Sequence, residues 1–413
     1  MAPPARLEVL RSHGAPRAPN RLIRGDNLPV LALLASEGAR FRCAYLDPPY
    51  NTGRRFAEYA DALAREDWLA MMRPRLEAVR DLLTEDGVVA VEIDDTELGP
   101  LLVLLDDVFG RENRVSTITV VRSAPTGHKA INAGPVHVSD YLLLYAKDRR
   151  AFRYRPQVRP RAGLDPAYGT WLENPGDPPA RFRFEPLRAV VARALGHATA
   201  RAATAALGKA GMDRAVAEHA LAHPEHVVRF AQPRYEAIAK EAQRLVDASR
   251  ERPDEVLVLE RPGLPPFIVR GGNRLLRLSA KVREVEGRPT VVEPLTNVWD
   301  DVPFQGIARE GGVVFSRNKK PERLVARVIA MTTDPGDAVL DPFLGSGTTA
   351  AVAHKLGRRW VGIEEGEHAF TLAEPRLARV VAGEDRAGIE PGFEGGGGFQ
   401  VARLVASMRR RGR

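Results

Sequence analysis

The chain has 413 residues, 44% of them hydrophobic, and a formal net charge of +8. This length predicts one large domain with an insertion, or two domains, and the positive charge favours a polyanionic partner. A single Cys excludes a disulfide framework and a multi-thiolate zinc site, so we expect an intracellular protein without a structural metal.

We expect residues 1–20 to be an N-terminal extension. They contain Pro and Arg but no long apolar run, so they resemble neither a secretion signal nor a membrane anchor. The segment 21–28 has the pattern of a short strand that ends in an acid, followed by a helix over 29–37. Asp26 at this boundary suits an N-cap for the helix.

The most informative stretch is Asp47–Tyr50, with the sequence Asp-Pro-Pro-Tyr. It follows a short apolar run, 41–46, that has the pattern of a buried strand stopped by prolines. The prolines fix φ and supply no N–H group, so the turn presents acceptors only. A carboxylate, carbonyl groups and a tyrosine ring suit a planar substrate with an exocyclic amine, such as a nucleobase. An ordinary loop that closes a strand is the alternative.

A helix and a strand follow this loop. Apolar residues recur at helical spacing over 65–83, and 88–93 is an apolar strand that leads into a helix over 98–109. Three acids lie between this strand and the second helix, and we assign them no catalytic role: Asp94, Asp95 and Glu97.

Strands over 114–122 and 141–145 complete a first catalytic half, 21–148. The loop between them carries His128 and Lys129. Such loop residues are usually solvated, and contact with a substrate is the alternative.

The segment 149–292 differs in composition, because arginines alternate with aromatic residues. This combination suits phosphate contact, guanine recognition and base stacking, which predicts a nucleic-acid surface. A solvated, Arg-rich surface domain is the alternative. The arginines that we expect to contact nucleic acid are Arg153, Arg155, Arg159, Arg161, Arg181 and Arg183.

A glycine loop occupies the last third of the chain. The segment 337–349 is a strand followed by glycines, and an Ala-rich helix and a second strand then lead to an acid, Glu364. Glycines allow close backbone approach, a helix N-terminus favours a negative group, and such an acid can take ribose hydroxyls. No Lys follows the last Gly, so this is not a Walker loop. The spacing predicts a nucleoside pocket, with an unliganded turn as the alternative.

We assign 293–385 to the cofactor-binding half of the same domain, with helices over 322–332 and 369–381. The remainder, 386–413, combines a strand over 399–404 with a basic tail. The arginines of this tail are Arg409, Arg410, Arg411 and Arg413.

The Asp-Pro-Pro-Tyr loop precedes the glycine loop in this chain. In this order the motifs resemble the β group of amino-methylating DNA methyltransferases, most closely the modification (Mod) subunit of type III restriction-modification systems. The resemblance covers about 20–150 and 295–405, and further matching stretches are 86–95 and 137–147. It implies an α/β, Rossmann-like S-adenosylmethionine-dependent methyltransferase sheet, circularly permuted, with an inserted target-recognition domain.

The resemblance also assigns site residues. Asp26 would meet the adenine amine of the cofactor and Leu28 would pack on its ring, while Lys320 would meet the cofactor carboxylate or merely flank a helix. The implied catalytic residues are Asp47, Pro48, Pro49 and Tyr50. The implied cofactor-binding residues are Asp26, Leu28, Lys320, Asp341, Pro342, Phe343, Gly345, Ser346, Gly347, Thr348 and Glu364.

The implied activity is methyl transfer from S-adenosyl-L-methionine to adenine N6 in duplex DNA, with the target base flipped out and stacked on Tyr50. Cytosine N4 is the nearest alternative; Asp47 favours adenine, because cytosine enzymes of this family more often carry Ser there. A silent DNA-binding subunit is the third interpretation. The implied partners are double-stranded DNA, a second copy of the chain and a helicase-nuclease restriction subunit. The implied location is the prokaryotic cytoplasm, in association with the nucleoid.

Overall fold

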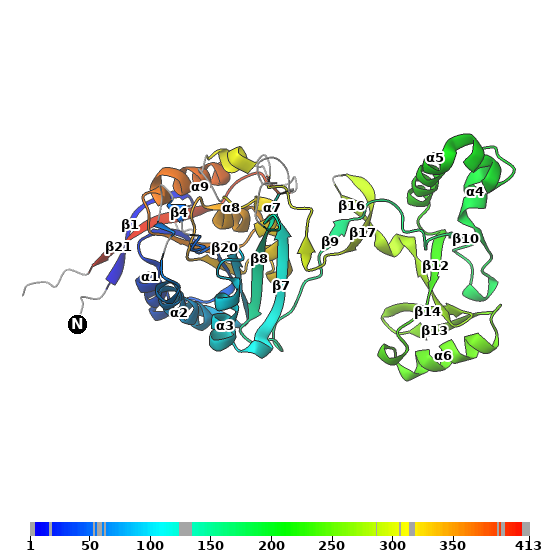
Figure 1. Ribbon diagram of the computed structural model, residues 1–413, viewed down its shortest axis with the longest axis horizontal. Coiled ribbons are helices and arrows are strands. Elements are labelled where there is room, and N and C mark those ends of the chain that lie inside the picture. Colours follow the sequence, from blue (N-terminus) through cyan, green and yellow to red (C-terminus); the bar gives the residue numbers. More distant parts are fainter. Residues whose placement is uncertain are drawn as a thin grey trace, which may run out of the picture. The chain divides into compact units, whose positions relative to one another are not determined.

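The computed structural model describes residues 5–15, 19–52, 54–55, 60–61, 63–123, 134–285, 287–304, 307–313, 319–385, 388–389 and 393–406. The chain forms two compact units (Figure 1): unit 1 comprises 1–157 and 295–413, and unit 2 comprises 158–294. The predicted loop residues His128 and Lys129, and the arginines of the C-terminal tail, lie outside the described residues.

Unit 1 is built on a ten-stranded sheet. In spatial order its strands are β1 (Ala5–Gly14), β21 (Gly398–Ala406), β2 (Asn20–Arg24), β20 (Arg359–Glu364), β19 (Ala338–Asp341), β3 (Phe41–Leu46), β6 (Leu83–Ile93), β8 (Ser139–Ala146), β7 (Arg114–Val121) and β18 (Val298–Trp299). A separate two-stranded hairpin pairs β4 (Arg54–Arg55) with β5 (Ala60–Asp61).

The six central strands, from β21 to β6, run parallel. Strands β19 and β20, from the C-terminal part of the chain, lie between β2 and β3 from the N-terminal part. The two sequence halves therefore interleave in one sheet and cannot form separate domains. This arrangement confirms the predicted α/β, Rossmann-like fold.

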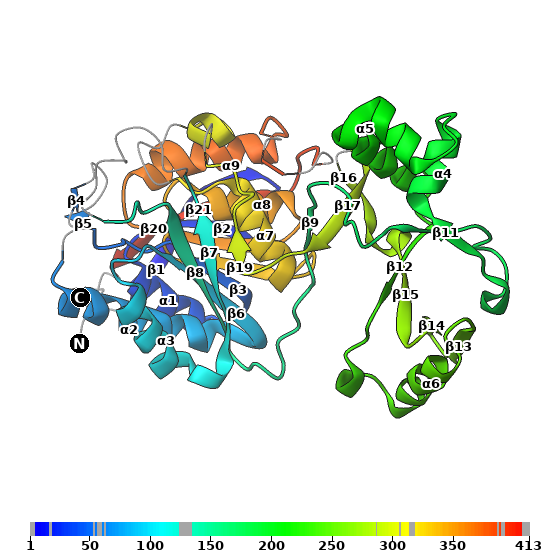
Figure 2. The same cartoon turned by 45° about the vertical axis from the view of Figure 1, so that its right-hand side comes forward.

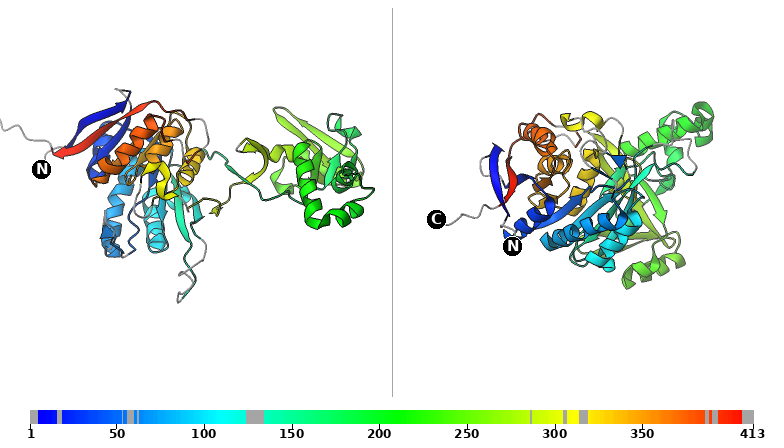
Figure 3. Two further views of the ribbon diagram at one scale, coloured as in Figure 1. Left: turned by 90° about the horizontal axis from the view of Figure 1, so that it is seen from above. Right: turned by 60° about the vertical axis from the view of Figure 1, so that its left-hand side comes forward.

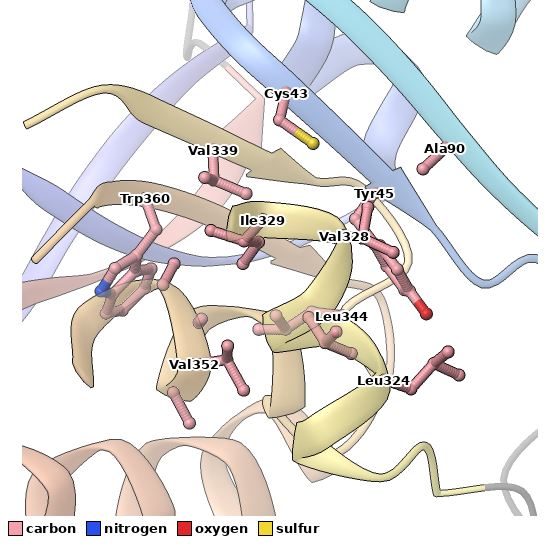
Figure 4. Packing of buried hydrophobic residues seen from close by; sticks show 14 of the residues in the cluster. Cys43, Tyr45, Ala90, Leu324, Val328, Ile329, Val339, Leu344, Val352 and Trp360 are labelled. Carbon is pink, nitrogen blue, oxygen red and sulfur yellow. The ribbon is translucent and has the colours of Figure 1, made fainter. Parts of the chain in front are cut away.

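Helices cover both faces of the sheet (Figure 1). One face packs against α1 (Asn27–Ser36), α2 (Arg65–Leu82) and α3 (Leu98–Phe109), and the other against α7 (Glu322–Thr332), α8 (Thr348–Lys355) and α9 (Glu374–Val381). A central parallel strand is buried on both faces, which is why 41–46 is almost continuously apolar. Successive side chains alternate between the faces, and Cys43 and Tyr45 point toward Val328 and Ile329 of α7 (Figure 4).

Part of the predicted N-terminal extension, 1–20, belongs to the sheet of unit 1, which corrects the prediction for the residues that the structure describes. Residues 5–14 form β1, which pairs antiparallel with β21, and the two strands lie side by side in both views of Figure 3. Arg11 and His13 of β1 both contact Glu374 at the start of α9. Composition alone does not predict this strand, because an edge strand carries many polar residues.

The predicted helix over 369–381 begins with a π-helical turn, Ala369–Ala373, and continues as α9. Among the described residues, no helix is both long and apolar enough to cross a bilayer.

Unit 2 begins at Val158 and ends at Pro294, whereas the sequence predicted an insertion over 149–292. Its six-stranded sheet has the order β11 (Phe184–Pro186), β10 (Thr170–Leu172), β12 (Val227–Ala231), β15 (Asn273–Arg277), β14 (Leu264–Arg270) and β13 (Val256–Arg261). A three-stranded sheet joins β16 (Val282–Val285), β17 (Arg288–Pro294) and β9 (Val158–Pro160).

Helices α4 (Leu187–Ala194) and α5 (Ala200–Ala222) lie toward one end of unit 2, and α6 (Lys240–Glu251) lies toward the other (Figure 2). The break between α4 and α5 has a local cause. Gly196 follows α4 with φ of 80°, a conformation that ends helices, and the Thr199 hydroxyl caps α5.

Candidate active site

The site lies where the sheet changes its direction of winding. Strand β19 leads into α8 on one face, while β3 leads through its loop into α2 on the opposite face. Chains that leave adjacent parallel strands toward opposite faces open a crevice at the carboxyl ends of those strands. A cavity of about 410 Å³ occupies this position.

The cavity brings together most of the residues that the sequence predicted for the site. Those that line it are Asp47, Pro49, Lys320, Asp341, Pro342, Phe343, Gly345, Ser346, Thr348 and Glu364. Five predicted residues are not among its lining residues: Asp26, Leu28, Pro48, Tyr50 and Gly347.

The Pro-Pro loop is anchored from α2. The indole N–H of Trp68, a fully buried residue, donates to the Pro49 carbonyl oxygen at 2.8 Å. Asn51 has φ of 59°, and no other non-glycine residue in the described ranges has a positive φ. Its amide donates to Glu97 Oε1 at 2.9 Å and accepts from the backbone N–H of Leu63 at 2.8 Å. The Trp68 indole therefore holds the Pro49 carbonyl and orients the loop.

Lys320 lines the cavity and contacts three side chains. Its ammonium lies 2.5 Å from Asp47 Oδ1, 2.6 Å from the Tyr50 hydroxyl oxygen and 2.8 Å from Glu92 Oε2. It also lies 4.7 Å from the centre of the Tyr50 ring. Lys320 therefore binds the Pro-Pro loop, and a role in holding a cofactor carboxylate stays a prediction.

Tyr50 is only 8% exposed and belongs to the core cluster between the sheet and α1–α3. Its phenol is held by Lys320 and its pKa is raised, first by burial and then by the negative charge of Asp47. Stacking of this ring on a flipped base stays a prediction.

Two acids near Lys320 were missed by the sequence analysis. Glu92 lies on β6 and is 1% exposed, and burial raises its pKa to about 7 despite the nearby ammonium. Asp140 on β8 is also buried, and burial raises its pKa too. For Lys320, burial lowers the pKa, but the carboxylates of Asp47, Glu92 and Asp140 together outweigh it and raise the pKa above its ordinary value. One sequence signal was available for Glu92: it is a charged residue inside a strand that is otherwise apolar.

The glycine loop is closed by Glu364. Its Oε2 accepts from the backbone N–H of Gly345 at 2.8 Å, and its Oε1 accepts from that of Gly366 at 2.9 Å. Burial alone would raise the pKa of Glu364, but His368 at 3.0 Å and the two backbone donors lower it, so the carboxylate is ionised. Asp341 at the end of β19 is buried, which raises its pKa to about 7.

A buried ionic cluster contacts the end of the same loop. Arg376 donates to the Thr348 hydroxyl at 2.8 Å and to Glu322 Oε1 at 2.7 Å. Lys355 donates to Glu322 Oε2 at 2.8 Å and to Asp385 at 3.1 Å. The side chains of Glu322, Lys355 and Arg376 are fully buried. No local sequence pattern predicts this cluster, because its members lie on three helices and one loop.

The Asp26 segment is fixed by Arg75 of α2. Asp26 Oδ1 accepts from the backbone N–H of Leu28 at 3.1 Å, which is the N-cap interpretation, and also from Arg75 at 3.0 Å. Arg75 donates to Asn27 as well, and the Asn27 amide donates to the Pro342 carbonyl at 2.8 Å. Asn27 and Arg75 both line the cavity, so they join the candidate site although the sequence analysis did not select them.

The predicted nucleic-acid arginines are divided between the two units. Arg153 and Arg155 belong to unit 1, because unit 2 begins at Val158. Arg153, Arg181 and Arg183 are exposed. Four of the six form ion pairs: Arg155 with Asp334, Arg159 with Glu293, Arg161 with Asp165 and Arg183 with Glu173.

The described ranges contain no group of three or more His, Cys, Asp or Glu side chains that could hold a metal ion.

Comparison with known proteins identifies the family. The family model described as DNA methylase matches residues 41–375. The chain belongs to the DNA methylase family. It is 28% identical to the HindVI Mod subunit of Haemophilus influenzae, named a probable type III restriction-modification enzyme, over 96% of this chain and 55% of that protein. It is 28% identical to the type II methyltransferase M.EcaI of Enterobacter cloacae, over 87% of this chain and 70% of that one.

These matches confirm the resemblance to type III modification subunits that the motifs indicated. This DNA methylase spans about half the length of the HindVI Mod subunit that it matches. Among solved structures, the PvuII DNA methyltransferase (cytosine-N4-specific) aligns with this chain at 12% identity and a TM-score of 0.42. The alignment covers 87% of this chain and 86% of that protein.

The buried cluster gives a first testable prediction. Glu322→Gln keeps the size of the side chain but leaves Arg376 and Lys355 buried without this carboxylate, which typically costs about 3–5 kcal/mol. We expect the free energy of unfolding, measured in urea, to fall by about this amount. As a control, Asp107→Asn removes the partner of Arg73 from an exposed pair and should leave the unfolding midpoint unchanged. Equal midpoints for wild type and Glu322→Gln would contradict the prediction.

Proposed function

We propose that this DNA methylase transfers a methyl group from S-adenosylmethionine to the N6 amine of adenine in duplex DNA. One observation carries the proposal: the Asp47 carboxylate and the glycine loop line one cavity. The Pro-Pro loop has acceptors for an amine, and the glycine loop has the features of a nucleoside site. An amine and a nucleoside are the two groups that this reaction must bring together.

The lining residues fit the cofactor. Glu364 is ionised and closes the glycine loop, so its remaining lone pairs suit ribose hydroxyls. Asn27 and Arg75 also line the cavity with polar groups. S-adenosylmethionine supplies a methyl group that is already activated by its sulfonium charge.

The chain itself has to prepare the amine. The N6 lone pair is delocalised into the adenine ring, so the nitrogen is a poor nucleophile in the planar form. Acceptors for its two hydrogens favour a tetrahedral nitrogen, and Asp47 and the Pro48 carbonyl can serve as these acceptors. The enzyme then acts mainly by positioning. The lone Cys43 is fully buried in β3, and its pKa is raised to about 12 by burial, so it is no nucleophile here.

The chemistry is tested by Asp47→Ala. The change removes an acceptor, so methyl transfer should collapse while cofactor affinity stays near that of the wild type. Single-turnover assays on unmethylated DNA, read by mass spectrometry of nucleosides, measure the rate and separate N6-methyladenine from N4-methylcytosine. A mutant rate within about tenfold of wild type, a difference of about 1.4 kcal/mol in barrier, would contradict the role of Asp47. No methylated nucleoside with the wild type would contradict the proposed function.

The cofactor site is tested by Glu364→Ala. Loss of this carboxylate also releases the N–H groups of Gly345 and Gly366, so calorimetry should show S-adenosylmethionine affinity at least tenfold weaker. Glu367→Ala is the matched control, because Glu367 lies three residues away, is 69% exposed and pairs with Arg24 outside the cavity. If Glu364→Ala binds the cofactor as tightly as the control does, the pocket assignment is wrong.

We further propose that unit 2 contacts the DNA and selects the sequence. The residues of the cavity all belong to unit 1, so the exposed arginines of unit 2, among them Arg181 and Arg183, lie outside the pocket and can contact DNA there. By similarity to type III Mod subunits, the chain also pairs with itself and with a restriction subunit that supplies cleavage.

The role of unit 2 is tested by charge removal. Arg181→Ala combined with Arg183→Ala should weaken DNA binding and lower the slope of log affinity against log salt, because each phosphate contact adds close to one unit to that slope. Fluorescence anisotropy over a salt series measures both quantities. Arg73→Ala combined with Arg80→Ala removes the same charge from α2 of unit 1. Equal losses in the two double mutants would show a general charge effect and contradict a specific role of unit 2.

A further inference from the structure

Glu92 has no role in the function proposed above, yet it is among the most deeply buried acids of the protein. It is 1% exposed and lies on β6, with its neighbours Val91 and Ile93 fully buried. An unpaired carboxylate in such a place would cost several kcal/mol, so a charged Glu92 needs a partner. Its partner is the Lys320 ammonium, 2.8 Å from Oε2.

Lys320 is shared between two carboxylates. The same ammonium that meets Glu92 also donates to Asp47 Oδ1 at 2.5 Å and to the Tyr50 hydroxyl at 2.6 Å. Two further titratable groups face this cluster, Asp140 from β8 and Tyr45 from β3, and Arg122 pairs with Asp140 at 3.1 Å. With all three acids ionised, the positive charges of Lys320 and Arg122 face three negative charges.

The sharing affects how well Asp47 can act as an acceptor. An ammonium bound to a single carboxylate withdraws negative charge from that carboxylate. The hydrogen bonds that the carboxylate accepts from other donors are then weaker. A second carboxylate on the opposite side of the ammonium competes for the same charge, and so leaves Asp47 a stronger acceptor. At the same time Lys320 occupies Oδ1, so that Oδ2 is the oxygen left for an incoming N–H group.

We propose that Glu92 is a positioning residue: its ionised carboxylate holds Lys320 between itself and Asp47, and thereby keeps Asp47 oriented and strongly accepting toward the target amine. This inference rests on the proposed methyl transfer. Protonation of Glu92 removes one of the carboxylates that share Lys320, so that the ammonium draws more strongly on Asp47 and the rate of methyl transfer falls.

The pH dependence follows from the protonation of Glu92. The carboxyl group has a pKa of about 7, so it is about 10% ionised at pH 6 and about 90% ionised at pH 8. With a protonated form that is about tenfold slower, the wild-type single-turnover rate, measured at saturating cofactor, should therefore rise about fivefold between pH 6 and pH 8. Asp341 has a pKa of about 7 as well, so the wild-type profile alone does not assign this change.

The assignment comes from Glu92→Gln, which mimics the protonated acid at every pH. Its rate should be about tenfold below that of wild type at pH 8 and should not change between pH 6 and pH 8. Glu92→Asp keeps a carboxylate, so it should retain the rise with pH and part of the rate. A role limited to folding would lower the amount of active enzyme without removing the pH dependence.

Glu374→Gln is the matched control. Glu374 is a buried carboxylate that pairs with Arg11 and His13 at the outer edge of the sheet, and its pKa is lowered rather than raised. This variant should keep the wild-type rise between pH 6 and pH 8. Thermal unfolding and cofactor calorimetry on each variant confirm that the enzyme compared is folded and loaded.

Two results overturn the inference on Glu92. One is a wild-type rate that does not change between pH 6 and pH 8. The other is a Glu92→Gln variant that retains the rise, because the titrating group would then be Asp341 or another residue. A wild type that methylates no DNA overturns the proposed function, and the inference falls with it, whereas an active wild type with either of the first two results overturns the inference alone.

Discussion

The ammonium of Lys320 is the charge on which the candidate site depends. It joins the loop after β3 to a segment 273 residues away in the sequence, and it is buried where water cannot compensate it. Three carboxylates, on the loop, on β6 and on β8, supply the compensation. Because a buried charge without its partners is strongly destabilising, the loop, the two strands and the segment before α7 form as one unit.

The N-terminus of α7 connects the two loops of the site. Lys320 binds the Pro-Pro loop, and Glu322, two residues later, binds the arginine and lysine that support the glycine loop. A shift of this helix end would displace the Pro-Pro loop and the glycine loop together. The helix therefore gives a physical link between the two substrates of the proposed reaction, although it belongs to neither motif.

The interleaved sheet explains why the motif order of the chain does not disturb the site. Strands β19 and β20 lie between β2 and β3, so the carboxyl ends of β3 and β19 are neighbours whichever of them comes first in the sequence. Unit 2 leaves unit 1 after residue 157 and returns at 295, between β8 and β18. An insertion at this point adds unit 2 without interrupting the strands that carry the acids.

The sequence by itself determined the fold class, the family, the Asp-Pro-Pro-Tyr loop, the glycine loop and Glu364, because each is a local pattern with a strict backbone requirement. The structural roles of a proline, a glycine or an acid at a strand end can be predicted from a few neighbouring residues. Only the tertiary structure decided that Lys320 meets Asp47, that Trp68 holds the Pro49 carbonyl, that Glu92 is part of the site and that residues 5–14 are an edge strand. The reason is physical: these contacts join residues on different elements, and the compensation of a buried charge depends on which elements pack together, which no local pattern contains.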